Sequence, residues 1–394
     1  MNRSSSFACA WLAVAGFVVS LPVARAAHAQ TPVTLPSTYG HTLRSKLNGA
    51  EYQLTVVLPA EYESSPSARY PTLYVMDGNR WAQLLAVLLP RFASRGAVPP
   101  IIVVGVDYQD ARQRYQDYGP LSQRYYPMDP KRGAVNFMRV MKEEIISFVD
   151  ANYRTDPKDR GIGGHSLGGL FAAYALLHES ETFQRFWISS PSLFYEDEML
   201  FKDFATFVKQ RISRPLYVFM DVGGEELPAM QGTLERFAQQ LSEAQRDKII
   251  ARTFVVPETN HMTVVPNVFA PALEHLYRYK PEITPAAVDL LRFAGDYQLP
   301  DGRVVTLITN GRELLYQDST IDFQTSGALV RLLASAANTF FQRGDGMEIA
   351  FPEGDAIPQR LQLREAATQQ WVEAVRLPPA TPKRVAQPTN PGRP

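Results

Sequence analysis

Short apolar runs alternate with longer amphipathic stretches between about residues 51 and 280. The apolar runs at 54–58, 72–76, 101–106 and 216–220 are predicted to be strands, and a further strand is expected at 252–256. The continuously apolar ones are typical of strands that are buried on both faces. Apolar positions recur with helical spacing at 135–149, 233–241 and 268–279. Strands that alternate with helices predict an α/β protein with a mostly parallel sheet covered on both sides.

The hydrophobic period changes after about residue 281. Residues 304–309 and 313–317 flank Asn310-Gly311, which predicts a β-hairpin with a type I′ turn, because both turn residues tolerate a positive φ. Further short strands are expected at 339–342, 348–351 and 360–363. We therefore predict a small antiparallel β domain over 288–377, followed by a disordered, proline-rich tail at 378–394.

The first thirty residues have the pattern of a secretory leader. Arg3 provides a positive start, an apolar run follows at 7–19, and Ala27-His28-Ala29 resembles a signal-peptidase site. The run is shorter than the roughly 20 residues that a spanning helix needs, and a single membrane anchor is the alternative. We expect residues 1–29 to be a signal peptide, and the mature protein to be periplasmic or secreted without stable membrane insertion.

Composition narrows the function classes. The chain has 394 residues, with 40 Lys and Arg against 40 Asp and Glu, so it lacks the basic excess of a nucleic-acid-binding protein. Its single cysteine, Cys9, lies in the predicted leader, which excludes a disulfide framework and a Cys-rich metal site in the mature protein. No metal or organic cofactor is expected, and the oligomeric state is left open.

A glycine-rich motif carries the main chemical signal. Gly164-His165-Ser166-Leu167-Gly168 fits the Gly-x-Ser-x-Gly pattern between a short predicted strand and an Ala-rich helix at 170–177. In a nucleophile elbow of this kind, the serine lies on a strained strand-to-helix turn, and side chains at the two glycines would collide. We predict that Ser166 is a nucleophile exposed at a helix N-terminus, with a glycine-rich packing turn as the alternative.

A serine hydroxyl needs a base, and elimination among the six histidines leaves His261. The other five are His28 in the leader, His41 before the predicted sheet, His165 in the elbow, His178 after the elbow helix and His275 on the last helix. His261 follows the strand at 252–256 and precedes a helix, where a base reaches over the nucleophile. A loop histidine with no role is the alternative.

The triad acid is expected between the serine and the histidine in the chain. Residues 216–226 offer Asp221 at the end of an apolar strand, and Glu225 and Glu226 in a loop opened by glycines. We favour Glu226, with Glu225 close behind, because the loop carboxylates are free to reach the histidine. The acid would hold the imidazole tautomer and stabilise the imidazolium. A solvated acidic pair at a helix start is the alternative.

An oxyanion hole needs two backbone N–H donors. Leu167, directly after the nucleophile, is the first candidate. The second is expected in the loop after the strand at 72–76, where Gly78 or Asn79 would donate. A turn without a catalytic duty is the competing interpretation.

These motifs together resemble the esterase D/putative-esterase branch of the α/β-hydrolases, which includes siderophore esterases, feruloyl esterases, S-formylglutathione hydrolases and mycolyltransferases. The resemblance covers about residues 45–280, and its motifs lie at 74–78, 152–156, 160–169 and 190–195. It implies an α/β-hydrolase catalytic domain, over 40–282 in this chain, and a triad of Ser166, Glu226 or Glu225, and His261. Many relatives have two tryptophans where this chain has Phe194-Tyr195.

Clues to the substrate come from a Tyr- and Arg-rich stretch at 108–126. We expect Arg114, Tyr118 and the loop residue Trp81 to bind an aromatic or anionic acyl group, with a partly exposed surface as the alternative. The predicted function is an exported serine hydrolase of small-molecule carboxylic esters, of siderophore or aromatic-acyl type. An acyltransferase with the same triad and a non-catalytic binding protein are the alternatives.

Overall fold

The computed structural model describes most of the chain. Its described residues are 34–94, 98–119, 131–244, 247–277, 290–319, 329–342, 347–354, 356–364 and 370–378. The predicted leader (1–29), residues 120–126 of the Tyr- and Arg-rich stretch, and the tail from 379 onward lie outside these ranges. Among the helices of the described ranges, none has both the length and the apolar character of a membrane span.

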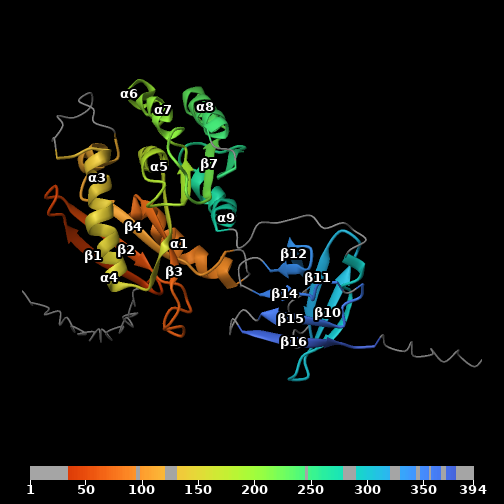
Figure 1. Cartoon of the computed structure of the whole chain (residues 1–394). Helices are drawn as coiled ribbons and strands as arrows, with labels where there is room; N and C mark the ends of the chain where they lie inside the picture. The colour runs from red at the N-terminus through yellow and green to blue at the C-terminus, as the bar shows by residue number, and fades with distance from the viewer. Residues whose placement is uncertain are drawn as a thin grey trace, which may run out of the picture. The chain divides into compact units, whose positions relative to one another are not determined.

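Eight strands form one sheet in the order β1-β2-β4-β3-β5-β6-β7-β8 (Figure 1). They are β1 (Thr38–Arg44), β2 (Glu51–Val57), β3 (Tyr70–Met76), β4 (Ile102–Tyr108), β5 (Thr155–His165), β6 (Arg185–Ser189), β7 (Leu216–Gly223) and β8 (Ile249–Val256). β1 and β2 pair antiparallel, as do β2 and β4, whereas neighbours from β4 to β8 are parallel. This confirms the predicted sheet. His41, expected before the sheet, lies in β1.

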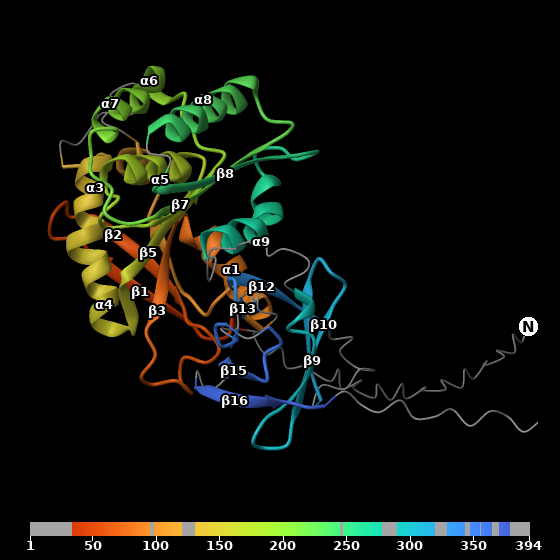
Figure 2. The same ribbon diagram turned by 45° about the vertical axis from the view of Figure 1, so that its right-hand side comes forward.

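Helices cover both faces of this sheet (Figure 2). On one face lie α1 (Gly78–Ser94) and α9 (Val264–Leu276). On the other lie α3 (Ala134–Val140), the π-helical turn η1 (Met141–Ile146), α4 (Ser147–Asn152), α5 (Leu167–His178), α7 (Phe204–Phe207) and α8 (Pro228–Ala244). The remaining elements are α2 (Ala111–Tyr118), α6 (Tyr195–Glu198) and the 3-10 helix η2 (Met199–Asp203). The sheet is therefore buried on both sides, which explains its continuously apolar strands.

The C-terminal strands close into an antiparallel barrel in the order β10-β11-β12-β13-β14-β15-β16-β9. They are β9 (Gly295–Gln298), β10 (Val304–Thr309), β11 (Leu314–Asp318), β12 (Val330–Ala336), β13 (Thr339–Phe341), β14 (Glu348–Ala350), β15 (Arg360–Arg364) and β16 (Trp371–Arg376). Apolar side chains such as Phe293, Tyr297 and Ile349 fill its core. The antiparallel β-rich C-terminal part is confirmed, and closure leaves it without sheet edges.

The hairpin of β10 and β11 forms, but the prediction of a type I′ turn is wrong. Thr309 pairs with Leu314, so four residues connect the strands, and Gly311 alone of the central pair has a positive φ, +83°. The Asn310 side chain instead accepts hydrogen bonds from the backbone N–H groups of Arg312 (2.9 Å) and Glu313 (3.0 Å). This side-chain turn replaces the tighter backbone turn.

Candidate active site

Ser166 occupies the tight turn between β5 and α5. Its backbone is in a strained conformation for a non-glycine residue, with φ +63° and ψ −119°. A Cβ on Gly164 would lie 2.6 Å from the carbonyl carbon of Gly168, and one on Gly168 would lie 3.0 Å from the Cβ of Met76. Gly164 is therefore required by close backbone packing across the turn, as the elbow prediction supposed, whereas the neighbour of Gly168 is the Met76 side chain in β3.

A cavity of about 530 Å³ opens over the Ser166 hydroxyl. Its lining consists of Arg114, Tyr115, Ser166, Leu167, Ser192, Phe194, Tyr195, Glu225, Glu226, Leu227, Met230, Asn260 and His261. Ser166 lies at the N-terminus of α5, where the helix dipole stabilises negative charge. The cavity thus brings together a hydroxyl, an imidazole, a carboxylate and an aromatic wall.

His261 is held by Glu226. Its Nδ1 lies 2.7 Å from Oε2 of Glu226, whose side chain is 1% exposed. A carboxylate at Nδ1 places the ring proton there and leaves Nε2 as the acceptor. The structure therefore brings Glu226, and not the exposed Glu225, to the histidine.

In the described residues, the hydroxyl of Ser166 has one hydrogen-bond contact, to the hydroxyl of Ser192 at 3.5 Å. Ser166 and His261 line the same cavity without a direct hydrogen bond between them. Such contacts often tighten only when substrate is bound.

Glu226 is ionised in its site. Burial alone raises the pKa of this carboxyl, but hydrogen bonds from His261, Ser190 and the Gly223 N–H outweigh it, so the pKa lies below its usual range. The N–H of Gly223 donates to Oε1 at 2.9 Å. The negative charge needed opposite an imidazolium is therefore present at neutral pH.

Asp221, the third candidate acid, has a different environment. It is fully buried, and its carboxyl accepts hydrogen bonds from Ser189 (2.6 Å) and the Trp187 indole (3.2 Å). Burial raises the pKa of Asp221 to about 7, although these hydrogen bonds oppose the rise. Its partners lie in β6 and do not include His261, so the structure gives it a role in holding neighbouring strands together.

His165 packs against His261 at a ring-centroid distance of 4.3 Å, and against Trp81 at 5.7 Å. Burial, with a further contribution from the charge of His261, lowers the pKa of His165 to about 3. His165 is therefore a neutral ring beneath His261, which agrees with the packing role inferred from its position in the elbow.

The candidate oxyanion donors are placed differently from one another. Leu167 lines the cavity at the first turn of α5. Gly78 and Asn79 begin α1 and do not line it; a Cβ on Gly78 would lie 2.5 Å from Gly105, and the Asn79 N–H donates to Asp107 at 3.0 Å. A role for Asn79 therefore requires its N–H to leave Asp107, and the second donor stays a prediction.

Of the predicted substrate-binding residues, only Arg114 lines the cavity. Its guanidinium forms a two-pronged ion pair with Asp77, at 2.7 and 2.8 Å. Tyr118 is 2% exposed and packs on Phe171. Trp81 is 8% exposed and belongs to the apolar core on the sheet face that α1 and α9 cover. The structure contradicts the expectation that these two rings contact the substrate, because both are buried in apolar cores and do not line the cavity.

Sequence reasoning overlooked several lining residues, namely Ser192, Leu227 and Met230. Ser192, like the lining pair Phe194-Tyr195, belongs to the motif at 190–195 that contributes to the family resemblance, and this motif could have identified it. Leu227 and Met230 lie beside Glu226 at the start of α8, and no pattern marks them. Among the described residues, no group of three or more His, Cys, Asp and Glu side chains is arranged to hold a metal ion.

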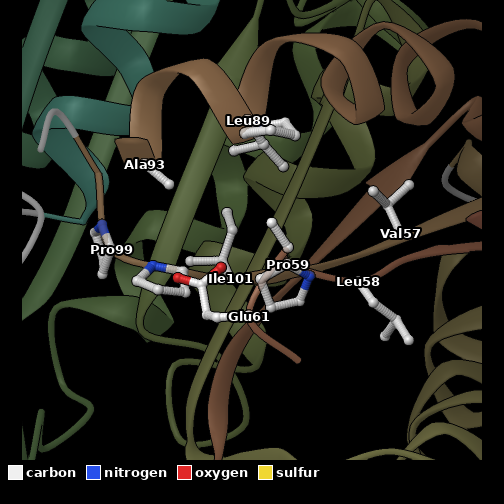
Figure 3. A pocket seen from close by; sticks show the side chains of 11 residues that line it. Val57, Leu58, Pro59, Glu61, Leu89, Ala93, Pro99 and Ile101 are labelled. Atoms are coloured by element: carbon white, nitrogen blue, oxygen red, sulfur yellow. The ribbon is translucent and has the colours of Figure 1, made fainter. Parts of the chain in front are cut away.

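A second cavity, of about 240 Å³, lies between the end of β2, the end of α1 and the start of β4 (Figure 3). Its walls are apolar and rich in proline, including Pro59, Pro90 and Pro99. Glu61 is its one ionisable lining residue, and no serine, cysteine or histidine lines it. The chemistry of the molecule is therefore concentrated in the Ser166 cavity.

Comparisons with known proteins find relatives among esterases. A family model described as "Putative esterase" matches residues 45–253. The chain is 26% identical to ferri-bacillibactin esterase BesA of Bacillus subtilis over 260 residues, covering 61% of this chain and 89% of that protein. It is 31% identical to an apo-salmochelin esterase of Escherichia coli over 140 residues, or 33% of this chain and 44% of the relative.

Solved structures share the sheet part of the fold. The BES protein from Bacillus cereus matches with a TM-score of 0.58 and 26% identity, over 63% of this chain and 99% of that one. An IroE-like serine hydrolase from Shewanella oneidensis has a TM-score of 0.54 at 23% identity, over 61% and 80% of the two chains. These likenesses confirm the predicted α/β-hydrolase fold.

Proposed function

The chain belongs to the "Putative esterase" family and is a carboxylic ester hydrolase, and we propose that it works through an acyl-enzyme on Ser166. The observation that carries the proposal is the 2.7 Å contact between His261 Nδ1 and Glu226 Oε2 beside the strained serine. In this arrangement His261 is the base and Glu226 is the acid that orients it.

The chemistry follows from the positions of these groups. The Ser166 hydroxyl attacks the ester carbonyl and passes its proton to Nε2 of His261, while Glu226 stabilises the imidazolium. The oxyanion forms at the N-terminus of α5, where the Leu167 N–H and the helix dipole stabilise it. The imidazolium then protonates the departing alcohol. A water molecule, deprotonated by His261, releases the acid from Ser166.

The proposed substrates are siderophore esters or aromatic-acyl esters. Support comes from the relatives, which are named ferri-bacillibactin and apo-salmochelin esterases. The cavity adds the rings of Tyr115, Phe194 and Tyr195 along its wall, and aromatic rings stack favourably on an aromatic acyl group. The leader-like pattern of residues 1–29 supports export of the enzyme.

Short p-nitrophenyl esters test the mechanism with wild type and Ser166→Ala. We expect the variant to lose activity by at least about 10⁴-fold, as in serine hydrolases that lack their nucleophile. A fluorophosphonate should label the wild type at Ser166 and leave the variant unlabelled. Equal activity of the two proteins, or labelling elsewhere, contradicts the proposal.

A trilactone siderophore and a feruloylated sugar separate the substrate classes. The proposal predicts a higher kcat/KM for at least one of them than for p-nitrophenyl acetate, because the aromatic wall contributes binding in the transition state. If p-nitrophenyl acetate is the better substrate in both comparisons, the aromatic-acyl assignment fails while the triad still stands.

A further inference from the structure

Ser190 is a buried serine directly after β6. It is 0% exposed and has a φ of +39°, which is strained for a residue with a side chain. Its hydroxyl donates to Oε1 of Glu226 at 2.5 Å. A strained, fully buried hydroxyl that binds the triad acid calls for an explanation beyond packing.

The contacts of Glu226 divide cleanly between its two oxygens. Oε1 receives Ser190 and the Gly223 N–H (2.9 Å), whereas Oε2 receives His261 (2.7 Å). A carboxylate on a glutamate side chain rotates readily unless both oxygens are engaged. With Oε1 held from two directions, the remaining oxygen points at Nδ1 of the histidine.

The turn that carries Ser190 also touches the nucleophile. The Ser190 N–H donates to the carbonyl of Asp221 at 2.7 Å, and the Ser192 N–H donates to the carbonyl of Ser166 at 3.1 Å. Gly169 lets this turn approach α5, since a Cβ there would lie 3.1 Å from the Cα of Pro191. Residues 190–192 therefore connect the acid and the nucleophile.

We propose that Ser190 is a positioning residue that holds the Glu226 carboxylate in register with His261. This inference rests on the proposed triad. The strained backbone is tolerated because it directs the hydroxyl toward Glu226, and the N–H contact to Asp221 keeps the turn in place. Ser190 does not line the cavity, so it acts through Glu226 and not on the substrate.

Ser189 provides a matched control. It is also 0% exposed, and its hydroxyl also donates to a buried carboxyl group, that of Asp221, at 2.6 Å. Ser189→Ala and Ser190→Ala thus each remove one buried hydrogen bond from a hydroxyl to a carboxyl group, and we expect similar losses of thermal stability. Only the second change loosens the partner of His261.

The first measurement is steady-state kinetics on a p-nitrophenyl ester. Ser190→Ala should lower kcat about 10-fold with little change in KM, because a charge-assisted hydrogen bond to the acid is lost. Ser189→Ala should leave kcat within about 2-fold of wild type. If the two variants lose kcat equally, Ser190 has a packing role only and the inference is overturned.

A double-mutant cycle with Glu226→Ala tests whether Ser190 acts through the acid. In the Glu226→Ala background, Ser190→Ala should not lower kcat any further, because no carboxylate is left to position. A further 10-fold loss would overturn the inference. If Ser190→Ala does not fold, Ser190→Cys keeps the size of the side chain with a weaker donor, and it should lower kcat in the same way.

The controls separate this inference from the proposed function. If Ser166→Ala loses activity but Ser190→Ala keeps the wild-type kcat, the role of Ser190 is refuted and the triad stands. Full activity in Ser166→Ala refutes both the triad and the role of Ser190.

Discussion

The eight-stranded sheet with its covering helices, here called the sheet part, and the C-terminal barrel differ in which residues have a positive φ. In the described residues of the sheet part, eight non-glycine residues have a positive φ, namely Ser37, Asp77, Ser166, Ser190, Glu196, Asp197, Glu198 and Glu258. In the described residues of the barrel, the positive φ values belong to glycines alone, at 295, 302, 311 and 354. The barrel thus has a relaxed backbone, whereas the sheet part carries strain.

Three of the strained residues directly follow parallel strands, at the edge of the sheet where the carboxyl ends of these strands lie. Asp77 follows β3, Ser166 follows β5 and Ser190 follows β6. Each such conformation costs on the order of 1–3 kcal/mol and persists only where the surroundings determine it. At this edge the surroundings are the Arg114 ion pair and the hydrogen bonds of Glu226. Three of the eight strained residues thus lie at the edge of the sheet that carries the Ser166 site.

The strongest test of this contrast compares Glu226→Gln with Glu225→Gln. The first change presents an amide to Nδ1 and favours the wrong imidazole tautomer, so kcat should fall roughly 10³- to 10⁴-fold. The second removes an exposed charge at the cavity, and we expect less than about a 10-fold change. Steady-state kinetics on one ester decides. A larger loss of kcat in Glu225→Gln would contradict the assignment of Glu226 as the triad acid.

A second test adds one methyl group to a glycine in each part. Gly164→Ala places a Cβ 2.6 Å from Gly168, so the elbow must shift, and kcat should fall about 100-fold or more. Gly354→Ala, at φ +90° and with open space around it, should cost about 1–2 kcal/mol of unfolding free energy. Its kcat should stay at the wild-type value. An active Gly164→Ala enzyme would show that the elbow is not tightly constrained.

A third test uses pH and the buried Asp221. Its pKa rises from 3.8 in the unfolded chain to about 7 in the fold. The folded state therefore holds a proton that the unfolded state has released, so this group's contribution to stability is lost as pH rises toward and through 7. Between pH 5 and pH 8 the loss is roughly 2–3 kcal/mol.

Asp221→Asn cannot titrate, so its unfolding free energy should lack this decrease with pH. Urea unfolding of both proteins at pH 5 and pH 8 measures the difference. The pKa assigned to Asp221 is refuted if the two proteins lose stability in parallel over that range.

The smallest effect is expected at the surface of the barrel. Arg360 and Glu373 form an ion pair at 3.2 Å with 63% and 43% of their side chains exposed. Solvent screens such a pair, so Arg360→Ala should change the unfolding free energy by less than about 1 kcal/mol and leave kcat unaltered. A loss of several kcal/mol would mean that the barrel depends on its surface charges more than its relaxed backbone suggests.

Local sequence determined much of this protein. The apolar runs at 72–76, 101–106 and 216–220 became β3, β4 and β7, because burial on both faces selects such strands. The elbow was equally readable, since Gly164 is constrained by Gly168, only four positions away in the chain. β1 and β6 were not predicted: the first is a largely exposed edge strand and the second has only five residues.

Only the tertiary structure decided between Glu225 and Glu226, which are adjacent in one glycine-opened loop. Glu226 meets His261 and Ser190, which are 35 and 36 positions away in the chain. It likewise assigned Tyr118 to the core, where Phe171 packs against its ring, and it closed the barrel by pairing β16 with β9. Local pattern constrains strands, helices and turns because those depend on neighbours in sequence, whereas the direction of a side chain depends on residues that only folding brings together.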